Sequence, residues 1–574
     1  MAAVDSTWAR WRVRLARLQL HSFRPALLDA LRDYDRSSFL KDLSAGATVG
    51  VVALPLAMAF GIASGVKPEQ GLFTAIIAGF LISALGGSRV QIGGPAGAFV
   101  VIIYGIIAQY GFANLLIATM CAGVLLFAMG LTRLGVLVRF IPVSIVIGFT
   151  NGIAVLIIVS QLKDLLGLSI DRMPADFFQQ AQLIGQSLPT INIYAVAVAA
   201  GSLAVMLLWP KIALPGSANR GQRFVRHLPG TLVALVLATA SVWLLDLPVE
   251  TIGSRFGGIP RALPSIALPD FSWEGVKQLV APTITIALLG AVESLLCARI
   301  ADKIIHHRHD PNQELMAQGI ANFVTPLFGG IPATGNIART VTNVKNGAVS
   351  PIAGIVHAVT LLAVVLIAAP LASSIPLAVL AAILLVVAYN MGEWQEFARL
   401  KNFPVTYRTI LLATFLLTVI FDLTVAVQVG LVLASLFFIY RISQITRIEP
   451  LPLSAAEAAS GVEAYRLYGS LFFGAVSKLE AVSDPTRYVG PDAPRVIVFD
   501  LALLISLDTT GVEALDTLHR QLARRGGTLI VSGPHEQPLS MLTRSGFIDR
   551  IGPENVVAEM SAALWRANLL ATSG

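Results

Sequence analysis

Residues 89–96 read Arg89-Val90-Gln91-Ile92-Gly93-Gly94-Pro95-Ala96, and residues 328–335 read Phe328-Gly329-Gly330-Ile331-Pro332-Ala333-Thr334-Gly335. Each stretch stands at the head of a hydrophobic run, in corresponding positions of two long apolar halves. Such interruptions are typical of transporters built from inverted repeats, in which unwound backbone meets half-helix N-termini near the bilayer midplane. Non-helical backbone is tolerated there only where protein or a water-filled cavity satisfies its polar groups. Because half-helix N-termini carry partial positive charge, the breaks predict a binding site for an anion.

The composition is that of an integral membrane protein. Of the 574 residues, 55% are hydrophobic and only 13% are charged, and the mean hydropathy is +0.74. These values exclude a soluble globular protein with ordinary surface statistics. The net charge of +7 could indicate nucleic-acid binding, but the basic residues gather in the N-terminal arm and in alternate loops. Topogenic charge explains that placement better, so we expect a lipid bilayer and no nucleic acid as partner.

Neither the cysteines nor the histidines predict a metal site or a cofactor. Cys121 and Cys297 both lie inside apolar runs, so they indicate no disulfide framework and no metal cluster. His306, His307 and His309 lie close together in a loop, but no cysteine or organised set of carboxylates completes a ligand set. A solvated loop is the favoured interpretation of these histidines.

Fourteen apolar runs are long enough, or nearly long enough, to cross a hydrocarbon core that needs about 20 helical residues. They form two sets of seven, and the third and tenth runs are short and begin at the two breaks. We expect the spans near residues 45–63, 71–86, 95–110, 113–131, 137–160, 192–209, 229–246, 279–299, 314–328, 333–345, 351–372, 376–391, 407–421 and 422–440.

The loop charges predict the orientation in the membrane. If the N-terminus is cytoplasmic, most lysines and arginines of the loops fall on the inner side, as the positive-inside rule requires. Residues 1–42 lack an apolar core followed by a small-residue cleavage site, so they are expected to be a cytosolic segment and not a signal peptide. The transmembrane domain is expected over residues 43–441, with both termini in the cytoplasm.

The composition changes after the last apolar run. A linker rich in proline and alanine is expected over residues 442–461, followed by a small soluble α/β domain over residues 462–570. Val496–Phe499 and Thr528–Val531 are predicted strands, and Thr510–Arg524 has the apolar spacing of a helix. Strand, helix and strand in this order predict a βαβ unit.

Several motifs resemble the signature of the sulfate permease (SulP) family, and the last domain resembles the STAS domain of that family. The resemblance covers about residues 38 to 565, and within the family it is greatest to the bacterial C4-dicarboxylate carriers. The residues that carry it are Asp42 to Gly50, Ala53 to Ala59, Gly71 to Ala75, Gly86 to Pro95, Glu293 to Leu296, Phe328 to Gly335, Ala338 to Thr340 and Pro351 to Gly354.

The resemblance implies a polytopic α-helical membrane protein with a seven-plus-seven inverted repeat. Spans 1 to 4 and 8 to 11 would form a core domain, and spans 5 to 7 and 12 to 14 a gate domain. The anion would lie between the third and tenth half-helices, and the protein would be a homodimer in the bacterial inner membrane.

Glu293 and Arg339 are ionisable residues within predicted spans. A charge at that depth costs several kcal/mol, so each residue needs a partner, a proton or a role. Glu293 could carry a coupling proton, pair with Arg339 or a cation, or be a structural carboxylate hydrogen-bonded to backbone amides. Arg339 could raise the positive potential at the anion site, or its side chain could extend to the cytoplasmic interface.

Residues at the heads of the two half-helices are the other candidate ligands. Thr334, Gly335 and Asn336 open the tenth span, where backbone N–H groups lack intrahelical acceptors, and Thr334 could also be the N-cap. Ala96 and Gly97 open the third span and leave room for an anion, although tight packing equally requires small residues.

Phe60 matches a position that lines the pocket in the family, although a phenylalanine in an apolar span more often serves packing. Leu56 stands where many eukaryotic members carry glutamine, so their substrates cannot be transferred to this chain. In the STAS-like domain, Thr510 occupies a position at which some relatives are phosphorylated. Thr510 and Glu513 also have the spacing of a capping box.

The sequence has no Gly-x-x-x-x-Gly-Lys-Ser/Thr loop, so it offers no P-loop motif for ATP-driven transport. We therefore expect a secondary transporter, and not an enzyme, that carries sulfate, bicarbonate or a C4-dicarboxylate with H⁺ or Na⁺. One alternative is an anion channel or uncoupled exchanger. Another is a membrane sensor that uses the STAS-like domain to bind a cytosolic partner and moves no solute.

Overall fold

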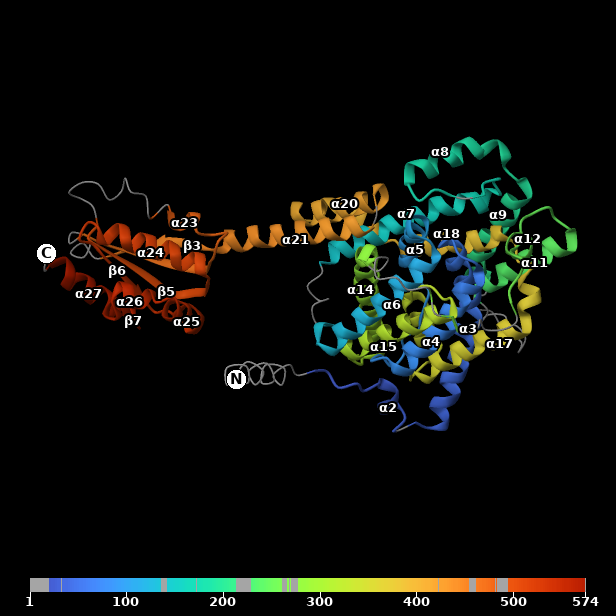
Figure 1. The fold of residues 1–574 in the computed structure, drawn as a ribbon, viewed down its shortest axis with the longest axis horizontal. Coiled ribbons are helices and arrows are strands. Elements are labelled where there is room, and N and C mark those ends of the chain that lie inside the picture. Colours follow the sequence, from blue (N-terminus) through green and yellow to red (C-terminus); the bar gives the residue numbers. More distant parts are fainter. Residues whose placement is uncertain are drawn as a thin grey trace, which may run out of the picture. The chain divides into compact units, whose positions relative to one another are not determined.

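The protein is described by a computed structural model that divides into two compact units, Met1–Leu431 and Val432–Gly574. The first unit is built almost entirely from helices, and the second contains the five-stranded sheet β3 to β7 (Figure 1). The structure describes residues 20–32, 34–135, 142–171, 173–212, 229–260, 266–267, 269, 277–421, 423–453, 461–480, 482 and 494–572.

Eight helices of the first unit, here called the core group, pack against one another. In this group α17 packs on α3 and α4, and α6 packs on α14 and α15, which lie side by side in Figure 1. The members are α3 (Arg36–Ala63), α4 (Pro68–Leu85), α5 (Gly97–Tyr110), α6 (Phe112–Leu131), α14 (Val280–Ile305), α15 (Pro311–Val324), α16 (Ile337–Lys345) and α17 (Ile352–Ala372).

Five further helices, here called the gate group, pack mainly among themselves. Here α7 packs on α18 and α20, and α9 packs on α11 and α18. The members are α7 (Val143–Leu166), α9 (Ile193–Ile212), α11 (Gly230–Leu245), α18 (Leu377–Met391) and α20 (Val405–Ile420). Helix α21 (Leu423–Ile445) follows α20 along the chain. The short connecting elements are α2 (Ala26–Ala30), α8 (Phe177–Ser187), η2 (Leu188–Thr190), α12 (Ile252–Phe256), η3 (Thr325–Phe328), α19 (Trp394–Ala398) and η4 (Leu400–Asn402).

Each of the fourteen predicted spans overlaps a helix, although residues 137–141 of the fifth span and residue 422 of the fourteenth lie outside the described residues. Six helices in the described ranges are long and apolar enough to cross a membrane, and the bent pair formed by residues 177–190 and 193–209 would make a seventh. The helices α5, α11, α17, α18 and α20 contain shorter apolar segments. The total of fourteen spans stays a prediction.

Glycines allow the closest helix contacts in the core group. A Cβ atom on Gly123 of α6 would lie 2.7 Å from the carbonyl oxygen of Gly319 on α15, and a Cβ on Gly319 would lie 2.7 Å from the carbonyl oxygen of Gly123. Real Cβ atoms do not approach backbone so closely, so both positions require glycine. Small residues at helix interfaces are the usual means of close packing in lipid.

The two sequence breaks meet in space. Strand β1 (Gly93–Gly94) pairs antiparallel with β2 (Thr334–Gly335), with Gly93 opposite Gly335 and Gly94 opposite Thr334. Gly94 has a φ of +150°, a conformation that residues with a side chain rarely adopt. All four residues are buried, and their backbone pairing satisfies polar groups that lipid cannot.

The second unit is an α/β domain with sheet order β3-β4-β5-β6-β7, in which only β3 runs antiparallel to its neighbour. Strand β3 falls inside the stretch for which the composition predicts a linker. The elements are β3 (Arg447–Pro450), β4 (Val462–Leu471), α23 (Ser477–Glu480), β5 (Val496–Leu507), α24 (Thr509–Ala523), β6 (Thr528–Ser532), α25 (Glu536–Arg544), α26 (Phe547–Ile551), η6 (Pro553–Asn555), β7 (Val556–Val557) and α27 (Met560–Thr572).

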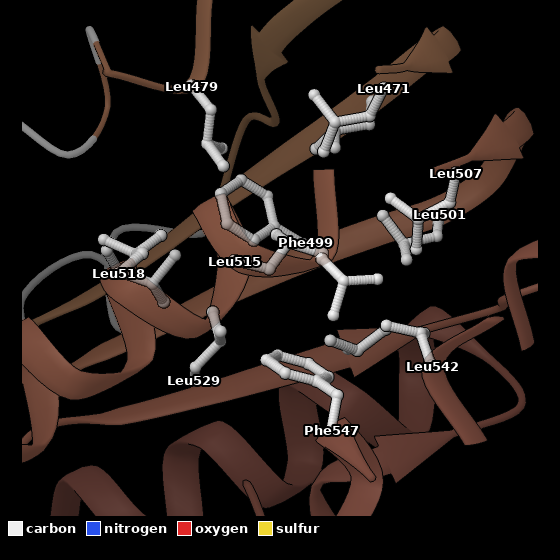
Figure 2. Close-up of a cluster of buried hydrophobic side chains, with 14 of the residues drawn as sticks. Leu471, Leu479, Phe499, Leu501, Leu507, Leu515, Leu518, Leu529, Leu542 and Phe547 are labelled. Atoms are coloured by element: carbon white, nitrogen blue, oxygen red, sulfur yellow. The ribbon is translucent and has the colours of Figure 1, made fainter. Parts of the chain in front are cut away.

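Alternating side chains of the central strand β5 build two hydrophobic clusters. Ile497 and Phe499 belong to a cluster that includes residues of α24, α25 and α26, and Figure 2 shows Phe499 beside Leu515. Val496 and Val498 belong to a second cluster with Ala563 and Ala567 of α27. The period of two along a strand explains how one strand supplies both faces of the sheet.

The capping box predicted at Thr510 is wrong. Asp508 is the N-cap of α24, and its carboxylate accepts a hydrogen bond from the backbone N–H of Gly511 at 2.8 Å. The same side chain accepts from the N–H of Phe473 at 3.2 Å, which ties the helix start to the end of β4. Thr510 is therefore the second residue of the helix and remains half-buried.

The histidine-rich loop is only partly solvated. His306 and His307 are exposed, whereas the side chain of His309 is 6% exposed and its Nδ1 lies 2.6 Å from an oxygen of Asp302. Desolvation, followed by the charge of Arg89, lowers the pKa of His307. The described ranges contain no group of three or more His, Cys, Asp or Glu side chains that could hold a metal ion.

Candidate anion-binding site

The pairing of β1 with β2 brings the N-termini of α5 and α16 together. Helix α5 begins at Gly97, three residues after Gly94, and α16 begins at Ile337, two residues after Gly335. The N–H of Asn336 donates to the carbonyl oxygen of Ile92 at 2.9 Å, which adds a third link between the breaks. First-turn N–H groups lack intrahelical acceptors and carry the positive end of the helix dipole. The arrangement is therefore suited to an anion.

Arg339 is a fully buried cation in the first turn of α16. Its side chain is among the largest buried ones, at 2% exposure, and Nε, Nη1 and Nη2 have no hydrogen-bond partner in the described part of the chain. Nη1 lies 2.6 Å from where a Cβ atom on Gly94 would stand, so the guanidinium lies against β1 and does not extend to solvent. A buried, unpaired charge is costly, so this group requires a negative partner.

Glu293 lies in the middle of α14 and is half-buried. Its Oε2 atom is buried without a hydrogen-bond partner, and within 4.0 Å no basic side chain of the described residues pairs with it. The predicted alternative of an ion pair between Glu293 and Arg339 is therefore absent here. The carboxylate can therefore bind a proton, a cation or a water molecule.

The sequence left open which residue caps the N-terminus of α16, and the structure gives Thr334 and Asn336 different roles there. The hydroxyl of Thr334 donates to the carbonyl oxygen of Gly290 at 3.0 Å, so Thr334 ties β2 to α14 and is not the N-cap. Asn336 is the N-cap of α16, because its Oδ1 accepts from the backbone N–H of Arg339 at 3.1 Å. Its Nδ2 reaches the carbonyl oxygen of Pro95 at 3.5 Å. One side chain thus orders α16 and contacts the first break.

Phe60 lies beside the head of α5. A Cβ atom on Gly97 would lie 3.4 Å from Cε1 of Phe60 and 3.3 Å from Sδ of Met391, so both side chains border this N-terminus. Ala96, the N-cap of α5, is buried and gives the helix no side-chain cap. Met391 ends α18 of the gate group, and nothing in the sequence distinguishes it from an ordinary apolar residue.

A buried polar network that the sequence analysis missed holds the first break in place. Oε2 of Glu314 accepts from the backbone N–H groups of Gly87 and Ser88, at 3.0 and 3.2 Å. Oε1 of the same carboxylate accepts from Ser294 at 3.3 Å, and Ser294 accepts from the amide of Gln91 at 3.0 Å. The network therefore links α15 and α14 to the chain that enters β1.

A signal for this network does exist in the sequence. Glu314, Gln318 and Asn322 are spaced four residues apart in an otherwise apolar run, which places them on one helix face. Asn322 holds the second break, because it accepts from the N–H of Ala333 at 2.9 Å and donates to its carbonyl oxygen at 2.8 Å. A polar stripe within a span thus marks the helix that carries the unwound segments.

A cavity lies near the C-terminal end of α5. It has a volume of about 1100 Å³ and is lined by residues of α3, α5, α7, α8, α12, α14, α20 and α21, including Tyr104, Lys163 and Arg255. Arg255 pairs with Asp164 at 2.7 Å and with Glu250 at 3.4 Å. The hydroxyl of Tyr104 donates to the carbonyl oxygen of Met173. The cavity therefore separates helices of the core group from helices of the gate group.

Paired unwound segments between two half-helices, with an unpaired arginine beside them and a cytosolic-type α/β domain after the last span, define a membrane transporter for anions. The profile of the Sulfate permease family matches residues 39–414, and that of the STAS domain matches residues 454–560. The chain belongs to the sulfate permease family, whose members are transporters and not enzymes.

Curated relatives match over nearly the whole chain. The "Putative sulfate transporter YvdB" of Bacillus subtilis is 44% identical over 529 residues, which cover 91% of this chain and 97% of that protein. The bicarbonate transporter BicA of Picosynechococcus is 30% identical over 559 residues, covering 92% of this chain and 94% of that protein. The family relationship is therefore not confined to one domain.

Solved structures agree with the fold. The transmembrane domain of a cyanobacterial bicarbonate transporter BicA matches with a TM-score of 0.61 and 31% identity, covering 69% of this chain and 98% of that chain. The structure of SLC26A9 matches with a TM-score of 0.82 at 18% identity, covering 98% and 95%. The second likeness extends the shared fold through the STAS domain.

Proposed function

We propose that this chain is a secondary active transporter that carries a small anion across the bacterial inner membrane, coupled to H⁺ or Na⁺. The substrate class is sulfate, bicarbonate or a C4-dicarboxylate, and the names of the relatives support the first two. The observation that carries the proposal is Arg339, a buried cation with no hydrogen-bond partner in the described part of the chain, beside two half-helix N-termini. An anion bound there neutralises the guanidinium and accepts hydrogen bonds from backbone.

The proposed site consists of Phe60, Ala96, Gly97, Glu293, Thr334, Gly335, Asn336 and Arg339. Backbone N–H groups of both half-helices bind the anion, Arg339 supplies charge, and Phe60 limits the size of the ligand. Thr334 and Asn336 position the second half-helix through their bonds to Gly290 and Pro95. Glu293, which lacks a partner for Oε2, carries the coupling proton or contacts the coupling Na⁺.

The division into two helix groups supports a mechanism of alternating access. The core group holds every proposed ligand, and the gate group faces it across the cavity at Tyr104. Movement of the core group against the gate group would expose the site to each side of the membrane in turn. We further infer that the protein is a homodimer with both termini in the cytoplasm, and that Thr510 of the STAS domain is a modification site for a cytosolic regulator.

Purified protein in liposomes tests the proposal. We expect uptake of labelled sulfate, bicarbonate or succinate against its concentration gradient when an inward H⁺ or Na⁺ gradient is imposed. Flux that only follows the anion gradient would favour the channel or uncoupled exchanger. No flux of any of the three anions by correctly folded protein would favour the sensor and overturn the proposal.

A further inference from the structure

His357 is a buried imidazole that the sequence analysis did not single out. It lies on α17, has 0% exposure, and neither Nδ1 nor Nε2 has a hydrogen-bond partner in the described ranges. Its Nδ1 and Cε1 lie 3.6 Å from where a Cβ atom on Gly79 of α4 would stand. Buried side-chain nitrogens without partners are rare in native proteins and call for an explanation.

The imidazole and the guanidinium of Arg339 border neighbouring positions of α4 and β1. The Cβ position of Gly79 is 3.3 Å from the carbonyl oxygen of Gly93, and the Cβ position of Gly94 is 3.4 Å from Cα of Ala75 and 2.6 Å from Nη1 of Arg339. Ala75 and Gly79 are four residues apart on α4, which corresponds to about 5–6 Å. The imidazole and the guanidinium therefore lie along the same seam between α4 and β1, where the charge of Arg339 would oppose a proton on His357.

Other charged groups on the surrounding helices are farther away or already paired. Gly50 of α3 contacts the backbone of His357. Asp42 lies eight residues earlier on α3, and its carboxylate accepts hydrogen bonds from the hydroxyl groups of Tyr34 and Ser350. Arg36 and Lys41 lie still nearer the start of α3, Glu69 begins α4, and Lys345 ends α16. At about 1.5 Å per residue these groups lie more than 8 Å along their helices from the seam. Among the described residues, Glu293 on α14 makes no hydrogen bond or ion pair with His357.

We propose that His357 is a second, proton-linked residue of the anion site: it is neutral while the site is empty and takes up a proton from solvent when an anion binds at Arg339. The inference rests on the proposed function of Arg339. Imidazole is the side chain that changes charge near neutral pH. Two cations that border the same buried seam repel each other, and a bound anion cancels that repulsion. Because linkage is reciprocal, protonation of His357 must strengthen anion binding.

The test measures the affinity of the purified full-length protein for sulfate, which keeps its charge between pH 5.5 and 8. We expect the wild-type affinity to rise about tenfold or more from pH 8 to pH 5.5, with net uptake of protons seen by calorimetry in two buffers of different ionisation enthalpy. His357→Gln should bind sulfate with an affinity that no longer depends on pH. A His357→Gln protein with the wild-type pH dependence and proton uptake would overturn the inference.

Two further variants separate this inference from its foundation. Glu293→Gln should keep the pH dependence of sulfate affinity. If Glu293→Gln lost this pH dependence while His357→Asn kept all of it, the proton would be assigned to Glu293 and the role of His357 would be refuted. Arg339→Ala with undiminished sulfate affinity would refute the proposed anion site itself. His357→Asn serves as the second variant because asparagine is smaller, so it does not depend on glutamine fitting beside Gly79.

Discussion

The half-helices α5 and α16 share a backbone arrangement but differ in their side chains. Helix α5 has 14 residues, is apolar and has no side-chain cap at Ala96. Helix α16 has 9 residues, is capped by Asn336 and carries the buried Arg339. The first half thus offers uncapped backbone donors, and the second adds charge. An inverted repeat can therefore supply symmetric geometry while one copy supplies the chemistry.

The same asymmetry extends to the neighbouring helices. Glu293, Arg339 and His357 all belong to the second half of the chain, and each has a buried polar atom without a partner in the described residues. Around the first break, Glu314 satisfies the backbone of Gly87 and Ser88. Glu314 therefore anchors the backbone of the first break, although Oγ of Ser88 and Oε1 of Gln91 there also lack partners among the described residues. The charged groups without a partner, Glu293 and Arg339, come instead from α14 and α16, which adjoin the second break.

The largest expected effect concerns Glu293. The Glu293→Gln substitution keeps the size of the side chain but removes its charge and its proton. We expect loss of uphill uptake in proteoliposomes, while anion exchange and anion binding persist. Glu69→Gln is the matched control, because Glu69 lies at the head of α4 and has an exposed lysine, Lys67, at 3.9 Å. Wild-type dependence on the H⁺ or Na⁺ gradient in Glu293→Gln would remove this residue from coupling.

The next effect tests whether the charge of α16 matters. Arg339→Ala should weaken anion affinity by about 1 to 3 kcal/mol, roughly 5- to 150-fold, because a hydrogen bond to a charged, desolvated group is lost. Lys345→Ala, on the same helix but exposed, should leave the affinity unchanged. Titration of both variants with sulfate and bicarbonate makes the comparison. Equal affinities for both variants and the wild type would show that Arg339 takes no part in binding the anion and would overturn the proposed site.

Much of the membrane fold could be predicted because apolar length and glycine breaks are local signals. The two breaks were expected to frame one site, and the structure adds that they pair directly, with Gly93 opposite Gly335. The roles of single polar residues could not be predicted, because they depend on neighbours distant in sequence. Thr334 binds Gly290, 44 residues away, and Glu314 binds Gly87, 227 residues away. His357 was missed for the same reason, since only the folded seam places it near Arg339.

A third prediction compares a glycine-to-alanine substitution at the second break with one at the head of α5. A Cβ atom on Gly335 would lie 1.9 Å from Nε2 of Gln91, whose side chain is held by Ser294, whereas a Cβ atom on Gly97 would lie 3.3 Å from Met391. Gly335→Ala should therefore destabilise the protein by about 1 to 3 kcal/mol, as overpacking does. Gly97→Ala should change the melting temperature little and anion affinity modestly. Thermal unfolding in detergent compares the two, and equal melting temperatures would show that Gln91 is free to move.

The smallest effect on the anion site is expected from the STAS domain, because every residue proposed to bind the anion lies between Phe60 and Arg339. Truncation after Ile445, where α21 ends, should leave anion affinity unchanged and lower only the transport rate, the yield or the dimer content. The cut must precede Arg447, because β3 pairs with β4 through Arg447 and Tyr468. A soluble fragment that starts at Arg447 should accordingly be more stable to urea than one that starts at Gly461, since the shorter fragment leaves an edge of β4 unpaired. A well-folded truncated membrane unit that binds no anion would show that the STAS domain takes part in the site.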